Sequence, residues 1–177
     1  NHGPVTELNI DRPPVNALNP ELVNALDAAI REAGKSSRAI VLSGRAGMFS
    51  AGLDVPELMQ LDREGMAEFW RRFFGLLETI ARSPVPIVAA ITGHAPAGGA
   101  VISLFCDYRV MASGEFVIGL NETRVGLLVP GVIRNTLIRL VGAHRAERMI
   151  TAGSLFNPQD ALQGGLIDAI ADNPESV

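Results

Sequence analysis

The sequence predicts an α/β fold in a single domain that spans residues 1–177. Two apolar runs, residues 39–42 and 85–91, are continuous rather than alternating, which is typical of strands buried on both faces of a parallel sheet. Residues 55–81, between these runs, carry a mainly helical pattern. Strand, helix, strand is therefore the recurring unit, and such units pack with right-handed crossovers.

The first elements have clear local signals. Residues 5–10 alternate apolar and polar side chains like a half-buried strand, and a turn-forming stretch at 11–14 ends it. A helix is expected to follow, because Asn19 is a favoured N-cap and Pro20 suits the first helical position. Gly34 is the predicted end of this helix.

The second half of the chain continues with short elements. After Gly93 we expect a Gly- and Ala-rich loop, and after Pro130 the chain is predicted to turn helical. The other expected elements are a short apolar helix at 99–105, strands at 108–111 and 116–118, and a helix from Asn157-Pro158 to Gly164-Gly165. Residues 171–177 end without a predicted closing element and the first residue is not Met, so we expect the chain to be a portion of a longer one.

The composition limits which classes of partner and which compartment we expect. A 177-residue chain with 47% hydrophobic and 19% charged residues builds one sizeable core. Net charge of -4 and only 5% aromatic residues give no support for a nucleic-acid partner. No apolar run approaches the roughly 18 residues that span a bilayer, so we expect a soluble protein. Cys106 is the only cysteine, which favours a reducing compartment, with the cytoplasm as the specific prediction.

Glu122 is the first candidate for catalysis. It ends the mostly apolar stretch 118–122, and a carboxyl group held there would lose hydration. Desolvation raises the pKa of a carboxyl group and makes it a usable proton shuttle near neutral pH. The alternative is a solvated surface charge, which is what most Glu residues are.

Two loops between a buried strand and a helix supply candidate backbone donors. In the first, residues 49–54, small side chains let a ligand approach the backbone, and the free N–H is expected on Leu53. Asp54 fits a capping box with Glu57, so we interpret it as a helix cap first and a catalytic acid second. The alternative for this loop is an ordinary strand-to-helix connection.

The second loop, residues 93–100, places Gly98 at or near a helix N-terminus, where its N–H favours a negative oxygen. A Gly98-Gly99 pair is also common in turns and in close helix packing. Two N–H donors that converge from separate loops are what an oxyanion hole requires.

The residues then match a known family. Both loops, the 118–122 segment, the 13–16 segment Pro-Pro-Val-Asn and the 106–109 segment Cys-Asp-Tyr-Arg together resemble the crotonase superfamily, also called the enoyl-CoA hydratase/isomerase family. The resemblance runs from about residue 5 to residue 170. Within the family the motifs look most like the Δ3,Δ2-enoyl-CoA isomerases.

The resemblance implies a fold and an assembly. The fold would be a crotonase-like spiral of β-β-α units, followed in the family by C-terminal trimerisation helices that this chain is expected to stop before. A homotrimer or a dimer of trimers is implied. The partner is an acyl-CoA thioester substrate, and no metal or redox cofactor is implied, since coenzyme A is part of the substrate.

The resemblance also implies site residues. The N–H groups of Leu53 and Gly98 would hold the thioester carbonyl, and Glu122 would be the acid/base. Hydratases of the family carry another glutamate three residues beyond the oxyanion glycine, where this chain has Val101. A lone Glu122 favours isomerisation, as in fatty acid β-oxidation. The substrate-binding set implied is Ser50, Ala51, Gly52, Leu53, Asp54, Gly98 and Gly99.

Alternatives stay open at this point. One is another enzyme of the same fold, such as a one-glutamate hydratase or an acyl-CoA hydrolase, lyase or decarboxylase, and another is an acyl-CoA-binding protein without turnover. His94 is expected beside the ligand rather than in catalysis, Cys106 as a buried thiol and Asp107 as a structural residue. Arg12 and Arg45 are both candidates for the CoA phosphates, and the aromatic stretch 61–74 fits either the acyl pocket or the core.

Overall fold

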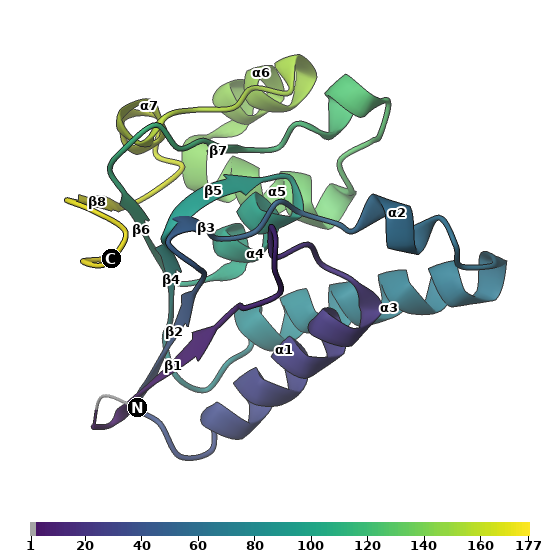
Figure 1. Cartoon of the computed structure of the whole chain (residues 1–177). Helices are drawn as coiled ribbons and strands as arrows, with labels where there is room; N and C mark the ends of the chain where they lie inside the picture. Colours follow the sequence, from purple (N-terminus) through teal and green to yellow (C-terminus); the bar gives the residue numbers. More distant parts are fainter. Residues whose placement is uncertain (1–2) are drawn as a thin grey trace.

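The computed structural model describes residues 3–177 and confirms the α/β prediction (Figure 1). The strands are β1 (Val5–Asn9), β2 (Ala39–Ser43), β3 (Gly47–Met48), β4 (Ile87–Ile91), β5 (Gly93–Pro96), β6 (Tyr108–Ala112), β7 (Ile118–Gly119) and β8 (Ala169–Ala171). The helices are α1 (Pro20–Ala33), α2 (Val55–Leu58), α3 (Arg63–Ala81), α4 (Gly98–Phe105), η1 (Glu122–Val125, a 3-10 turn), α5 (Gly131–Val141), α6 (Ala143–Ala152) and α7 (Pro158–Gln163).

Two parallel sheets form the centre of the domain. The larger sheet has five strands in the order β1-β2-β4-β6-β8, and the smaller one has three, β3-β5-β7. Each strand of the smaller sheet follows a strand of the larger one along the chain, so β2-β3, β4-β5 and β6-β7 are successive turns of one spiral. The predicted spiral of β-β-α units is thereby confirmed.

Two long helices, α1 and α3, lie side by side along the larger sheet (Figure 1). Asn19 caps α1 as predicted, since its side chain accepts a hydrogen bond from the Leu22 N–H at 2.9 Å, and Pro20 takes the first position. The buried faces of the two helices meet in the core through residues such as Leu26, Ile30 and Phe73. This packing fixes the inner face of α3, which carries the aromatic residues.

The structure differs from the sequence prediction in four places. Residues 55–81 form two helices because the Asp62 side chain accepts from the Gly65 N–H at 2.7 Å and starts α3 anew. The predicted loop after Gly93 begins as β5, which pairs with β3 and β7. The last strand of that sheet lies at Ile118–Gly119 rather than at 116–118. At residues 169–171, for which no element was predicted, β8 pairs with β6 at the edge of the larger sheet.

The short strands position the site. β3, β5 and β7 lead into the loop 49–54, the start of α4 and the start of η1, respectively. Because the three strands are parallel neighbours, the segments that follow them meet at one edge of the small sheet. No helix within residues 3–177 combines the length and the apolar character needed to cross a lipid bilayer.

Candidate active site

A cavity of about 390 Å³, here called the central cavity, lies where these segments meet. Its wall is mostly apolar and comes from the loop 49–54, the helices α2 to α5 and the η1 turn. The lining residues are Ala51, Leu53, Val55, Trp70, Phe73, Phe74, Ala97, Gly98, Val101, Asn121, Glu122, Val125, Leu127, Leu128, Pro130 and Ile133. Apolar cavities with few polar groups are the usual form of small-molecule sites.

Asn16 holds the loop 49–54 in place through hydrogen bonds. This residue is fully buried, and its side-chain amide donates to the carbonyl of Ile10 at 2.7 Å and to that of Phe49 at 3.1 Å. Its own carbonyl accepts from the Ser50 hydroxyl at 2.8 Å. The loop therefore has a fixed backbone path, which is a requirement for an aimed N–H group.

Leu53 has the free N–H that the sequence predicted. Around it, the Leu18 N–H donates to the Gly52 carbonyl at 2.7 Å and the Asp54 N–H donates to the Leu18 carbonyl at 3.0 Å. These bonds pair the neighbours of Leu53, whereas its own N–H finds no acceptor within residues 3–177. Leu53 lines the central cavity, so this donor is available at the cavity wall.

Gly98 is the second candidate donor, at the first position of α4. Before it, Ala97 has φ 48° and ψ -119°, a conformation that costs a non-glycine residue about 1–3 kcal/mol and is found at functional sites. Two bonds hold Ala97 in this state, from its N–H to the Gly119 carbonyl and from the Val101 N–H to its carbonyl. In the described part of the chain the Gly98 N–H has no acceptor, and the helix dipole of α4 adds to its positive character.

The two donor loops are in backbone contact. A Cβ atom added to Gly98 would lie 3.0 Å from the Gly52 Cα, so the second loop touches the residue directly before Leu53. Leu53 and Gly98 both line the central cavity. Two residues with unpaired backbone N–H groups thus line one cavity from separate loops, as the residues of an oxyanion hole would.

Glu122 is the one ionisable side chain among the residues that line the central cavity. It begins η1 directly after β7, and its Oε2 atom is buried without a hydrogen-bond partner. Burial raises the pKa of this carboxyl group above its usual value, and a hydrogen bond from its own backbone N–H opposes the shift more weakly. The direction agrees with the expectation for a desolvated carboxyl group.

Val101 is the position at which the resemblance led us to expect a further glutamate in a hydratase. It lies on α4 three residues after Gly98, is 2% exposed and lines the central cavity. The cavity wall is therefore apolar at this position.

The other predicted substrate-binding residues lie at different depths. Ala51 lines the central cavity together with Leu53 and Gly98. Ser50 is fully buried beneath the loop, and Gly99 packs so closely on it that a Cβ there would lie 2.4 Å from the Ser50 carbonyl oxygen. Asp54 caps α2 by accepting from the Glu57 N–H at 3.1 Å, as predicted. For Ser50, Asp54 and Gly99 the structure thus assigns supporting contacts outside the cavity wall.

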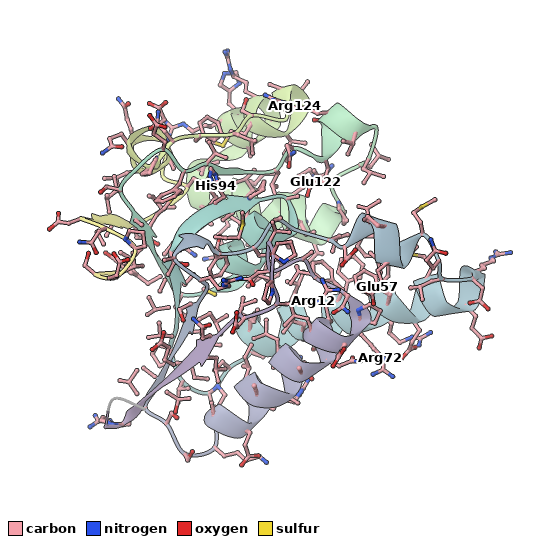
Figure 2. All side chains as sticks on the ribbon, viewed as in Figure 1. Arg12, Glu57, Arg72, His94, Glu122 and Arg124 are labelled. Carbon is pink, nitrogen blue, oxygen red and sulfur yellow. The ribbon has the colours of Figure 1, made fainter. Side chains whose placement is uncertain are left out.

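The two arginines proposed for the CoA phosphates are already paired. Arg12 bonds to Glu57 at 2.8 Å (Figure 2) and to Asp54 at 2.7 Å. Arg45 lies 3.5 Å from Asp11. The Glu57 carboxylate also accepts from Asn19, in place of the backbone contact expected of a capping box. Arg12 therefore acts as a brace between the N-terminal segment and the loop 49–54.

His94, Cys106 and Asp107 lie outside the cavity wall. His94, expected beside the ligand, is not among the residues that line the central cavity: its ring packs edge-on against Phe116, 5.3 Å between centroids, and its Nδ1 accepts from the Val117 N–H. Cys106 is 2% exposed and burial raises the pKa of its thiol to about 12, as expected of a structural thiol. Asp107 accepts from the Ile87 N–H at 2.8 Å and has the expected structural role.

The aromatic stretch on α3 contributes to the core and to the wall of the central cavity. Trp70, Phe73 and Phe74 line the central cavity, and Phe73 is also packed in the core together with Phe69. The rings contact one another, with Phe69 and Phe73 stacked at 6.0 Å and Trp70 edge-on to Phe73 at 5.9 Å. One face of this helix is thus both core and cavity wall.

Sequence reasoning gave no role to Asn16, Ala97 or Asn121. The first was part of the quoted 13–16 segment, but no pattern in the sequence indicated that its amide would be buried under the loop. Asn121 gave no signal beyond its position next to Glu122. Within residues 3–177, no group of three or more His, Cys, Asp or Glu side chains lies close enough to hold a metal ion.

Comparisons with known proteins agree on one family. A family profile described as enoyl-CoA hydratase/isomerase matches residues 1–177. The human protein named enoyl-CoA delta isomerase 1, mitochondrial, is 38% identical over 170 residues, which cover 94% of this chain and 56% of that protein. A Mycobacterium avium protein named probable enoyl-CoA hydratase is 38% identical over 165 residues, covering 91% of this chain and 63% of that protein.

Solved structures give the same two names. The crystal structure of human mitochondrial delta3-delta2-enoyl-CoA isomerase matches with a TM-score of 0.94 and 35% identity, covering 98% of this chain and 69% of that one. An enoyl-CoA hydratase from Bacillus anthracis matches with a TM-score of 0.88 and 27% identity, covering 94% and 66%. The chain therefore spans little more than half the length of the human relative it matches, and both reaction names occur among similar proteins.

Proposed function

The chain belongs to the enoyl-CoA hydratase/isomerase family, and from this premise we propose that it moves a carbon–carbon double bond in an enoyl-CoA thioester from position 3 to position 2-trans. The observation that carries the proposal is the central cavity's one ionisable side chain, Glu122, with Val101 at the place of a further glutamate. Hydration uses a water that is held and activated between two acidic groups, whereas moving a double bond needs one group that takes a proton and returns it.

In the proposed reaction the Glu122 carboxylate removes a proton from C2 of a 3-enoyl-CoA. The electron pair of the broken C–H bond moves onto the thioester oxygen and gives a conjugated enolate. The N–H groups of Leu53 and Gly98 stabilise this oxyanion, a contribution of about a hundredfold to a thousandfold in rate per donor. The acid form of Glu122 then returns the proton to C4, and the double bond forms between C2 and C3.

The raised pKa of Glu122 supports both halves of this cycle. A base whose pKa lies closer to neutral than that of an exposed Glu accepts the C2 proton more readily and still gives it up to C4. The apolar wall around Glu122 is the cause of the shift and excludes water that would compete for the enolate.

The substrate's parts fit the rest of the cavity. We place the acyl chain against the aromatic face of α3, where Trp70, Phe73 and Phe74 line the cavity. Ala51 and Gly98 leave the loop backbones open to the thioester. Coenzyme A enters as part of the substrate, and the reaction as written draws on no metal or redox cofactor.

Pathway, assembly and compartment are part of the same proposal. A role in fatty acid β-oxidation and a homotrimer or dimer of trimers follow from the resemblance. The cytoplasm is proposed from the cysteine content alone, and the name of the human relative places that protein in mitochondria. Since the chain covers 56% of that relative, activity and assembly of the whole protein are proposals as well.

Hydration of a 2-enoyl-CoA by Glu122 alone is the second candidate function. It is favoured by the Mycobacterium avium relative, which is as identical to this chain as the human isomerase and is named a probable hydratase. Val101 argues against this candidate, because it leaves Glu122 without a second acidic group to hold the water. Acyl-CoA binding without turnover is the third candidate, and Val101 does not argue against it.

A panel of thioesters separates these candidates. We expect the protein to convert 3-enoyl-CoA into the conjugated, ultraviolet-absorbing 2-trans product and to add water to 2-enoyl-CoA at a far lower rate. Calorimetric binding without product in the same samples would instead support the third candidate.

Glu122→Gln tests the acid/base group directly. It removes the proton shuttle but keeps the shape of the side chain, so isomerisation should fall by about 10²- to 10⁴-fold with acyl-CoA binding intact. Glu115→Gln is the matched control, because Glu115 is exposed and lies on the same segment outside the cavity wall. Near-normal turnover in Glu122→Gln would disprove the mechanism.

A further inference from the structure

Asn121 is at the N-cap position of η1, but its side chain does not cap the turn. It directly precedes η1, with φ -105° and ψ 17°, and its side chain makes no capping hydrogen bond. Asparagine is favoured at such positions because its side-chain oxygen accepts a backbone N–H. Here the Asn121 carbonyl closes the turn by accepting from the Arg124 N–H at 3.0 Å, and the side chain lines the central cavity instead. The amide is therefore free for another role.

Two buried acceptors without a donor lie on adjacent residues at this cavity. Oδ1 of Asn121 and Oε2 of Glu122 are both buried with no hydrogen-bond partner. Across residues 3–177 the only other buried side-chain N or O atom without a partner is Nε of Arg109, which is a donor. Burying an acceptor without a donor is costly, so each of these two oxygens indicates that a hydrogen-bond donor is missing at this part of the cavity.

The Asn121 side chain itself carries that donor. Its Nδ2 atom is absent from the buried unpaired atoms of residues 3–177 and makes no hydrogen bond to the protein, so it lies at an accessible position. A half-turn of the amide about the Cβ–Cγ bond exchanges Nδ2 for Oδ1. The buried position then holds a donor, and Oδ1 moves to the accessible side, where water pairs with it.

We propose that Asn121, with its amide turned in this way, is a positioning residue for Glu122, whose Oε2 accepts a hydrogen bond from Nδ2. This bond fixes the plane of the carboxyl group and leaves Oε1 as the oxygen that exchanges the proton with the substrate. The contact is independent of the reaction, whereas its catalytic value rests on the proposed function.

The bond would also control the charge of Glu122. A donor to a carboxylate favours the charged form, so it counteracts the burial that raises the pKa of Glu122. No charged group contributes to that shift, whose causes are burial and the residue's own backbone N–H. Removing the Asn121 amide should therefore raise the pKa of Glu122 further.

The charged groups of the neighbouring elements do not face Glu122, so they do not mask an effect of Asn121 on the pKa of Glu122. On η1, the Arg124 guanidinium lies 3.5 Å from the Ala152 carbonyl of α6, away from Glu122 (Figure 2). Arg145 and Arg148 of α6 line a separate cavity with Asp160. The elements α2, α3 and α5 contribute only apolar residues to the wall around Glu122, and α4 and β7 contain no ionisable residue.

Carboxyl-detected ¹³C NMR of the ligand-free protein tests the contact. The Glu122 carboxyl signal is assigned by its loss in Glu122→Gln. The pH midpoint of its titration is then measured in the unmodified chain and in Asn121→Leu, which keeps the side-chain volume. We expect the midpoint to rise by about one pH unit or more, the worth of one hydrogen bond to a charged group. Thr123→Val is the matched control: it removes the Thr123 hydroxyl's bond to the Ile150 carbonyl from the same turn, outside the cavity wall, and should leave the midpoint in place.

Kinetics give the second readout. In Asn121→Leu we expect kcat for isomerisation to fall at least about tenfold with KM changed less than about threefold. The reason is that the Glu122 carboxyl group loses its orientation, whereas the pocket that binds the substrate is kept. If Asn121→Leu does not fold, Asn121→Asp replaces it, because an aspartate carboxylate cannot donate a hydrogen bond to Glu122 and should raise the Glu122 midpoint. An unchanged midpoint in the folded variant overturns the proposal. The NMR titration needs no turnover, so a protein that proves not to be an isomerase would still answer it.

Discussion

Gly52 touches Gly98 through the backbone: a Cβ atom at Gly52 would lie 2.9 Å from the Gly98 nitrogen. Gly52 also has φ +94°, a conformation that side-chain-bearing residues rarely adopt. The residue directly before one candidate donor thus contacts the other candidate donor. The spacing of the two N–H groups depends on the absence of one methyl group.

Gly52→Ala should therefore separate the two donors. The added Cβ must push Gly98 away, and the loss of one aligned donor predicts about a hundredfold to a thousandfold lower isomerisation. Gly142→Ala is the matched control, because Gly142 has φ +84° and no atom within 4 Å of the added Cβ. It carries the same conformational cost, so it should lower the melting temperature without a selective loss of kcat. Equal activity losses in the two variants would argue against the contact.

Glu122 should make the protein less stable as pH rises. Burial raises its pKa in the folded state above the unfolded value of about 4.3, so the folded state binds more protons over this range. The stability that this group contributes is complete below the unfolded pKa and is lost as pH rises through the folded pKa. Glu122→Gln removes the charge and should melt higher than the unmodified protein at pH 8, with a much smaller difference at pH 4. Thermal melts at both pH values check this, and an equal difference at pH 4 and pH 8 would contradict the burial of this carboxyl group.

The fold was predictable wherever the signal was local. The cap at Asn19 and the buried runs of β2 and β4 depend on residues next to one another in sequence. β3 and β5 escaped prediction because they are two and four residues long and are defined by pairing between segments far apart in the chain, such as Gly47 with Gly93. A two-residue strand leaves no periodic pattern.

Some features of the candidate site could likewise be predicted from the sequence, and others could not. Glu122 could be proposed from its apolar surroundings, and the burial of its carboxyl group follows from them. The strained state of Ala97 and the buried amide oxygen of Asn121 could not, because both depend on how the chain folds around them. The loop assignment of His94 was wrong for a related reason: this residue lies in β5, and its ring packs against Phe116.

Arg12 should act through the loop 49–54 rather than through the CoA phosphates. Its guanidinium is occupied by Asp54 and Glu57, and Asp54 is one residue from Leu53. We expect Arg12→Ala to lower kcat/KM by a similar factor for an acyl-CoA and for the corresponding acyl-pantetheine, which lacks the phosphates. Asp54→Asn, which weakens the same ion pair, should reproduce the effect. A loss confined to the CoA substrate would instead identify Arg12 as a phosphate ligand.

Val101 should be the position that withholds hydratase chemistry. Its side chain is 2% exposed and lines the cavity with Glu122, so a glutamate there would face the same substrate. Val101→Glu supplies a second acidic group that holds and activates a water, and we expect hydration of 2-enoyl-CoA to rise at least about tenfold above the unmodified protein, the lower range of an acid/base contribution. Val101→Gln has nearly the same size and cannot ionise, so it should show no gain and serves as the control. The buried carboxyl group will also lower the melting temperature, which makes the assay meaningful only below the unfolding transition of the variant. A folded Val101→Glu protein that hydrates no faster than Val101→Gln would show that a further glutamate is not what separates the two reactions here.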